Sequence, residues 1–174
     1  MTNGNPELRN KLQRLTEPPD GAGTEWLQDQ IRQMEELNKR LPHSVRLYTQ
    51  CSEDIFDLNC FMFALGLEPH AGADMRIGHI FPGERFVQFL LADEHLIETT
   101  TKPSIAIYFR DGRPLHAGKM DANSVISKWG GGGTHIWQHD LWDVPVQYGE
   151  EVRFFANLPT ATELFLKWAA DHGI

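Results

Sequence analysis

The chain has 174 residues, of which 41% are hydrophobic and 23% charged, a composition typical of a folded domain rather than a disordered segment. The formal net charge of −8 argues against the basic face that nucleic-acid binding requires, so we expect no nucleic-acid partner. Only two cysteines are present, Cys51 and Cys60, which excludes a disulfide framework and leaves either one bridge or free thiols.

The sequence contains no basic region followed by an apolar run at its start, and no stretch apolar enough to span a bilayer. We therefore expect no membrane association and synthesis in the cytoplasm, with signal-independent secretion left open.

A first helix is predicted where Leu8, Leu12 and Leu15 recur at helical spacing. A stretch rich in proline and glycine follows and breaks the helical pattern. These features divide the chain into an N-terminal helix with its linker, residues 1–23, and a single α+β domain, residues 24–174.

A second, longer helix is predicted before Pro42, and its apolar positions form one stripe. The members of the stripe are Leu27, Ile31, Met34, Leu37 and Leu41. Such a stripe is typical of a helix packed on a core, and a groove for a partner is the alternative.

The rest of the chain is predicted to form strands and helices joined by short connections. The predicted helices start at Cys60 and span 83–92, and a surface loop is predicted at 70–78. The predicted strands are 45–49, 96–100, 104–109, 114–120, 125–129 and 151–155, with a strand or turn at 134–141. A capping box at Thr160 and Glu163 predicts the start of a final helix that runs to residue 170. Helices, then strands joined by short turns, then a helix indicate an α+β fold with an antiparallel sheet.

Cys60 is predicted to lie in the first turn of a short apolar helix, with Asn59 as its N-cap and Gly66 just past its end. The free backbone N–H groups and the helix dipole favour an anion there, so we expect a lowered thiol pKa and a nucleophilic Cys60. The alternative is a small buried side chain without chemistry.

His116 is predicted to share a face with the apolar residues of the preceding strand. Asp111 and Gly112 form a hairpin turn signal, and this register places His116 opposite Ile107. The apolar Cys60 helix is expected to cover that face, which would aim the imidazole at the thiol as a general base. A core histidine bonded to backbone is the alternative.

A metal site is an alternative interpretation of the cysteine and histidines. The candidate ligands are Cys60, His116, His135 and His139. The glycines before His135 disfavour a zinc-binding helix, so we expect no metal and no cofactor.

Three tryptophans lie close together in the sequence, and they belong either to the core or to the rim of a substrate groove. They are Trp129, Trp137 and Trp142.

Residues 59–66, followed by His116, Ala117 and Gly118, resemble the papain-like cysteine peptidases of the NlpC type. The resemblance spans residues 45–156 and implies a helix carrying the nucleophilic cysteine, packed on an antiparallel sheet. A downstream strand would carry the histidine. The bulky residues after Cys60, where the family usually has small ones, depart from its pattern.

The resemblance also implies a third residue that orients His116. The family often has a histidine about a dozen positions later, and this chain has Ser127 near that place, with His139 farther along. Either His139 or Ser127 could orient His116, and His139 is preferred. Tyr48 or Gln50 would supply an oxyanion donor beside the Cys60 backbone.

The function implied by the resemblance is thiol-dependent hydrolysis or acyl transfer at an amide bond. The substrate would be a peptide, an isopeptide or a peptidoglycan-like cross-link, and deamidation or transglutamination would use the same groups. A bacterial toxin-type effector fits this description. The alternative is a catalytically silent domain on the same fold that binds a partner protein.

Overall fold

The computed structural model describes residues 4–17, 25–52, 58–67, 83–130 and 134–173. These residues form a mixed α+β structure with an antiparallel sheet, as the order of elements predicted. In chain order the elements are α1 (Pro6–Thr16), α2 (Glu25–Arg40), β1 (Arg46–Thr49), α4 (Cys60–Leu65), α6 (Glu84–Ala92), β2 (Ile105–Arg110), β3 (Arg113–Asp121), β4 (Ser124–Lys128), β5 (Ile136–His139), the 3-10 turn η1 (Val146–Tyr148), β6 (Glu151–Phe155) and α7 (Ala161–Asp171).

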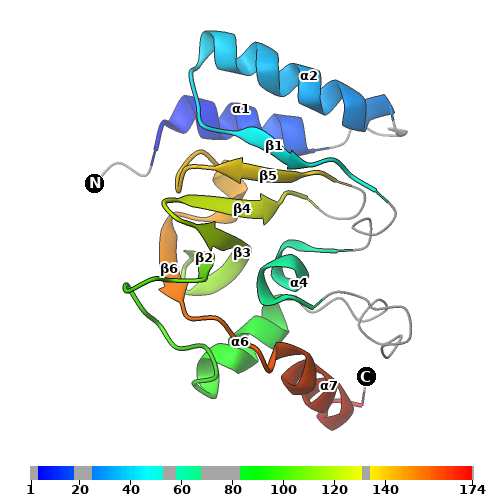
Figure 1. The fold of residues 1–174 in the computed structure, drawn as a ribbon, viewed down its shortest axis with the longest axis vertical. Helices are drawn as coiled ribbons and strands as arrows, with labels where there is room; N and C mark the ends of the chain where they lie inside the picture. The colour runs from blue at the N-terminus through cyan, green and yellow to red at the C-terminus, as the bar shows by residue number, and fades with distance from the viewer. Residues whose placement is uncertain (1–3, 18–24, 53–57, 68–82, 131–133, 174) are drawn as a thin grey trace.

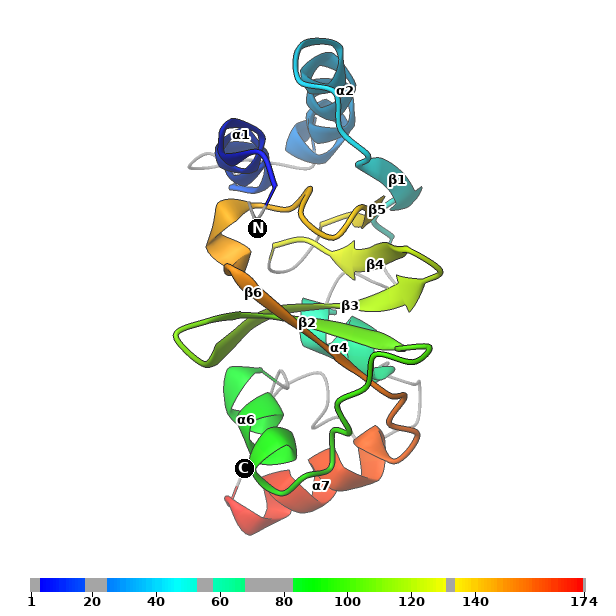
Figure 2. The same ribbon diagram turned by 90° about the vertical axis from the view of Figure 1, so that its left-hand side faces the viewer.

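The sheet lies between two layers of helices (Figure 1). The described strands follow the order β1-β5-β4-β3-β2-β6. Helices α1 and α2 lie on one side of the sheet, and α4, α6 and α7 lie on the other, as the turned view also shows (Figure 2). No helix in the described ranges is long and apolar enough to cross a membrane.

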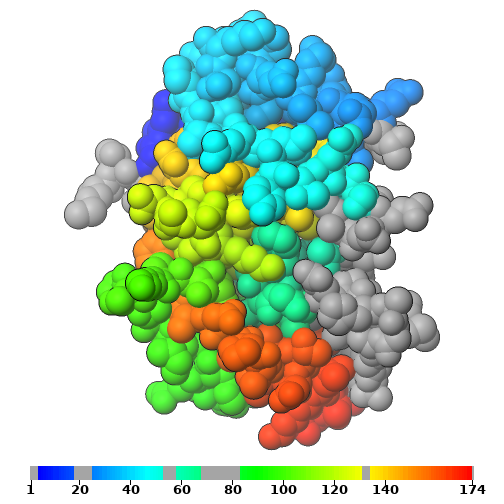
Figure 3. All heavy atoms as spheres, viewed as in Figure 1, coloured from blue at the N-terminus to red at the C-terminus, as the bar shows by residue number. Residues whose placement is uncertain are grey.

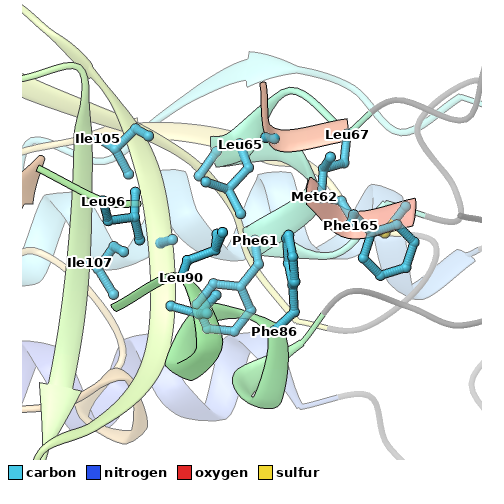
Figure 4. Packing of buried hydrophobic residues seen from close by; sticks show 14 of the residues in the cluster. Phe61, Met62, Leu65, Leu67, Phe86, Leu90, Leu96, Ile105, Ile107 and Phe165 are labelled. Atoms are coloured by element: carbon cyan, nitrogen blue, oxygen red, sulfur yellow. The ribbon is translucent and has the colours of Figure 1, made fainter. Parts of the chain in front are cut away.

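Successive side chains of β2 point to opposite faces of the sheet, so the strand contributes residues to two hydrophobic cores. Ile105 and Ile107 belong to a core with α4, α6 and α7, in which Phe61, Leu90 and other side chains gather on the sheet (Figure 4). Tyr108, with its opposite pleat direction, belongs to the second core beneath α1 and α2. Because both faces of β2 are covered, the strand reads as a nearly continuous apolar run.

The hairpin between β2 and β3 has the predicted turn but not the predicted register. Arg110 pairs with Arg113 as expected, and the positive φ angles of Asp111 and Gly112 suit a primed turn. The register then shifts by one residue, so His116 pairs with Tyr108 instead of Ile107. A β-bulge of this kind moves every later side chain of the strand to the other face.

Three further expectations have different outcomes. Residues 96–100 do not form a strand, and only Glu98 makes an isolated bridge, to Phe155. Thr160 precedes α7, but its side chain makes no capping hydrogen bond, so the capping box is wrong. The loop predicted at 70–78 lies outside the described residues.

Helix α1 is fixed to the second core. Leu8 and Leu12 are buried there, and the buried Arg9 donates from Nε to the carbonyl of Val144 at 3.2 Å and from Nη2 to that of Gly149 at 2.5 Å. These bonds join α1 to the chain about 140 residues away. The domain division after residue 23 stays a prediction, but α1 itself is part of the packed structure.

Replacing Arg9 by methionine should lower the free energy of unfolding by about 2–4 kcal/mol, because two buried carbonyls lose a charged donor. Urea unfolding followed by circular dichroism measures the change. Arg14→Met, on the exposed face of the same helix, is the control and should change stability by less than about 0.5 kcal/mol. Equal small effects would contradict the anchoring role of Arg9.

Candidate functional site

The helix that carries Cys60 has the predicted ends. Cys60 is the first residue of α4, and the Asn59 side chain accepts a hydrogen bond from the Met62 N–H at 2.8 Å. Gly66 ends the helix in the left-handed conformation, with φ of 69°. Cys60 is half-buried, and its thiol is free. Both helix ends could be predicted from the sequence, because the N-cap residue and the C-terminal glycine act on their immediate neighbours in the chain.

The Cys60 thiol meets the sheet at β3. The ladder between β3 and β4 runs from Asp121↔Ser124 to Lys119↔Ile126, and the strands stay close at Gly118, where an added Cβ would lie 2.9 Å from Ser127 Cβ. The next residue, Ala117, forms a backbone hydrogen bond with the Cys60 thiol.

His116 precedes Ala117 and points to the other side of the sheet. The prediction that it faces the α4 layer is wrong, because the bulge turns it toward Tyr108. Its ring stacks on Tyr148, with centroids 3.7 Å apart and planes 5° apart. Its Nε2 is buried and has no hydrogen-bond partner in the described part of the chain.

Tyr148 interacts with both His116 and Cys60. Besides stacking on His116, its hydroxyl accepts the Gly130 N–H at 2.9 Å. Burial raises the pKa of Tyr148, and the charge that Cys60 would carry as a thiolate raises it further, which places Cys60 and Tyr148 within electrostatic range. Sequence reasoning assigned Tyr148 no role, because an aromatic residue in a turn carries no local signal for stacking.

Ser127 and His139 bind each other rather than His116. Ser127 Oγ lies 2.8 Å from His139 Nε2, and Trp129 Nε1 donates to the same Oγ at 2.9 Å. His139 Nδ1 lies 2.9 Å from the Asp140 carbonyl. Because a carbonyl only accepts, His139 carries its proton on Nδ1, and Ser127 donates to Nε2. Neither candidate therefore orients His116 through a hydrogen bond; Tyr148 holds its ring by stacking.

Burial dominates the electrostatics of the thiol. It raises the pKa of Cys60 to about 11, although backbone hydrogen bonds from Ala117, Phe61 and Cys60 and the charge of Lys128 act to lower it. The expected lowering of the Cys60 pKa is therefore wrong for the resting protein. The first-turn effect is present but smaller than the cost of removing a thiolate from water.

The histidines are also held neutral. Burial lowers the pKa of His116 well below its ordinary value, and repulsion from His139 lowers it further. Burial lowers the pKa of His139 to about 4. At neutral pH the site holds a thiol and neutral imidazoles, so His116 can accept a proton but no ion pair is formed at rest.

Lys128 is a buried cation near the thiol that sequence reasoning did not single out. It lies at the end of β4, and its Nζ donates to the Thr134 carbonyl at 2.9 Å. Its charge lowers the pKa of Cys60. A lysine in a strand looks like an exposed residue in the sequence, and only the covering layer makes it a buried charge.

The proposed oxyanion donors lie apart from the thiol. Tyr48 is on the edge strand β1 and is 55% exposed, and Gln50 just after the strand is also exposed. Strands β5 and β4 separate β1 from β3. Among the described residues no hydrogen bond joins Tyr48 or Gln50 to Cys60, so their role stays a prediction.

The metal alternative has no support in the described ranges, where no three histidine, cysteine or acidic side chains are placed to hold an ion. His135 accepts the Cys51 N–H at Nδ1 and donates from Nε2 to the Leu27 carbonyl. Both ring nitrogens of His135, like those of His139, are engaged by the protein. Neither ring therefore has a nitrogen left for a metal.

The tryptophans belong to the second core. Trp129 and Trp137 are fully buried in it. Trp142 is partly buried and packs against the same core, and the Arg9 guanidinium lies over its ring.

Comparison of the chain with models of protein families, with curated proteins and with solved structures gives no match.

Stability should fall as the pH decreases from about 6.5 to about 4, because the unfolded chain protonates His139 in this range while the folded protein resists it. The lowered pKa of His139 alone corresponds to a loss of roughly 3 kcal/mol across the range. Urea unfolding at pH 7, 5.5 and 4.5 measures the slope. In His139→Gln the slope should be shallower, whereas identical slopes would contradict this role.

Labelling of Cys60 by iodoacetamide should be slow at pH 7 and should rise about tenfold per pH unit as the thiolate fraction grows. Lys128→Met should slow the labelling further by removing a nearby positive charge, and Lys128→Arg should restore it. Mass spectrometry separates Cys60 from the control Cys51, and thermal unfolding checks the fold. Unchanged labelling in Lys128→Met would exclude the charge effect.

Proposed function

We propose that the protein is a thiol-dependent hydrolase or acyl transferase that acts on an amide bond, on a papain-like fold of the NlpC type. Cys60 attacks the carbonyl carbon, and His116 accepts the thiol proton and returns it to the leaving group. The substrate class is a peptide, an isopeptide or a peptidoglycan-like cross-link, consistent with a toxin-type effector. This assignment of substrate rests on the sequence resemblance alone.

The observation that carries the proposal is the contact between the Cys60 thiol and the Ala117 backbone, because His116 is the adjacent residue of β3. Tyr148 stacks on His116 and lies within electrostatic range of Cys60. His116 faces the other side of the sheet from α4, but its Nε2 is buried without a described partner and the Cys60 thiol is free, so both groups are available for a proton transfer.

The proton transfer must be coupled to attack. Moving a proton from a thiol with a pKa of about 11 to an imidazole with a pKa below 6.5 costs roughly 6 kcal/mol or more in the resting site. A preformed thiolate is therefore rare, and His116 acts as a general base during bond formation. The charge of Lys128 and the first turn of α4 lower this cost.

The pKa values of Cys60 and His116 also favour a second candidate, a catalytically silent domain that binds a partner protein. His116 points away from the α4 layer, and burial holds both reacting groups in their neutral forms. In this case Cys60 and His116 serve only as packed side chains, Cys60 against the core with α4 and His116 on Tyr148.

Acylation by p-nitrophenyl acetate tests the two candidates, because this small activated ester needs no specific pocket. We expect a burst of p-nitrophenolate and an acyl group on Cys60, the fingerprint of a covalent intermediate. His116→Gln should reduce the rate at least about 100-fold, as expected for loss of a general base. The reaction is followed by absorbance and by mass spectrometry of the labelled peptide.

Cys51→Ser is the matched control and should acylate at the wild-type rate, since Cys51 follows the edge strand β1, which β5 and β4 separate from β3. Circular dichroism must show that His116→Gln is folded. If folded His116→Gln acylates as fast as the wild type, or if Cys60 reacts no faster than Cys51, the catalytic proposal fails and the silent domain remains.

A further inference from the structure

Helices α1 and α2 line a groove of about 720 Å³. The two helices lie next to each other in both ribbon views, and Gln30 Nε2 of α2 donates to the Leu15 carbonyl of α1 at 2.8 Å (Figures 1 and 2). Leu15, Leu37 and Leu41 contribute apolar side chains to its lining. This volume lies within the range of ordinary ligand-binding sites.

The apolar stripe of α2 is only partly covered by the core. Of its five members Met34 alone is fully buried, whereas Leu27, Ile31, Leu37 and Leu41 are half-buried. A helix that serves only as a core element would bury most of its stripe. Figure 3 shows α2 at the upper end of the molecule, where nothing in the described chain lies above it.

The charges around the groove are mostly basic, in a chain whose net charge is −8. Lys11, Arg14 and Arg40 line it and are exposed, and none forms an ion pair with a described residue. Arg32 is paired with Asp29 on its own helix.

Two acidic residues also line the groove, and each is stabilised by an interaction with its own helix. Glu36 is bound by Lys39, and Glu7 lies in the first turn of α1, where the helix dipole stabilises a carboxylate. The charge of Arg40 also acts on Glu36. With four basic side chains against two acidic ones in its lining, the groove keeps an excess of positive charge.

We propose that this groove binds an amphipathic helix of a partner protein, with leucine-like side chains on one face and acidic residues along its flanks. The apolar side chains would enter between α1 and α2, and the carboxylates would meet Lys11, Arg14 and Arg40, which is the usual helix-in-groove arrangement. A small anion would leave the leucines uncovered, and a nucleic acid has no apolar face to place there. The proposal does not depend on the chemistry of Cys60, which lies across the sheet.

The probe is a synthetic peptide of about four helical turns, with leucines at i, i+3, i+4 and i+7 and glutamates on both flanks. Its partner probe has the same leucines but lysine in place of every glutamate. Fluorescence polarisation with the full chain should show saturable binding of the acidic peptide and binding at least about tenfold weaker for the lysine peptide.

Arg14→Glu combined with Arg40→Glu should weaken binding of the acidic peptide by about tenfold or more. The matched control combines Arg85→Glu and Lys167→Glu, which reverses two exposed charges on α6 and α7 across the sheet, and should bind as the wild type does. Circular dichroism should be unchanged in both double variants.

Several results would overturn the proposal. They are no saturable binding, equal binding of both peptides, or equal loss in both double variants. Sedimentation that shows self-association lost only in the groove variant would assign the groove to a second copy of the chain. Binding to phosphatidylserine vesicles, lost in the same variant while the acidic peptide does not bind, would assign it to a membrane.

Discussion

The close approach of β3 to β4 at Gly118 is the constraint on which the candidate site depends. A side chain at Gly118 would place its Cβ 2.5 Å from Val125 Cγ1 and 2.9 Å from Ser127 Cβ. The next residue, Ala117, lies in the core with α4, and its backbone forms a hydrogen bond with the Cys60 thiol. The absence of a side chain at Gly118 thus lets the two strands meet beside the residue that α4 contacts.

The bulge in β3 decides which side chain faces the α4 layer. One extra residue after the turn sends His116 to the Tyr148 side and leaves Ala117 facing the α4 layer. Bulges often occur next to active sites, where they bend the strand and re-aim a side chain. Here the imidazole of His116 lies on the side away from α4, while the backbone of the next residue, Ala117, bonds the Cys60 thiol.

The helix ends and the turn near the site could be predicted from the sequence, but the thiol pKa and the contacts between distant residues could not. Asn59, Gly66 and the Asp111 turn act through their own neighbours, so the sequence shows them directly. The pKa of the Cys60 thiol depends on all the residues that bury it, and burial raises this pKa more than the hydrogen bonds at the helix start lower it. The Ser127–His139 bond likewise depends on how β4 and β5 are aligned.

By itself the sequence determined the α+β class, the helix that begins at Cys60, the hairpin turn and the apolar faces of α1 and α2, because each follows from short-range pattern and propensity. The tertiary structure alone decided the bulge, the face of His116, the burial of Lys128 and the groove between α1 and α2. These features depend on how residues far apart in the chain meet, and one residue of register reverses the face of a strand.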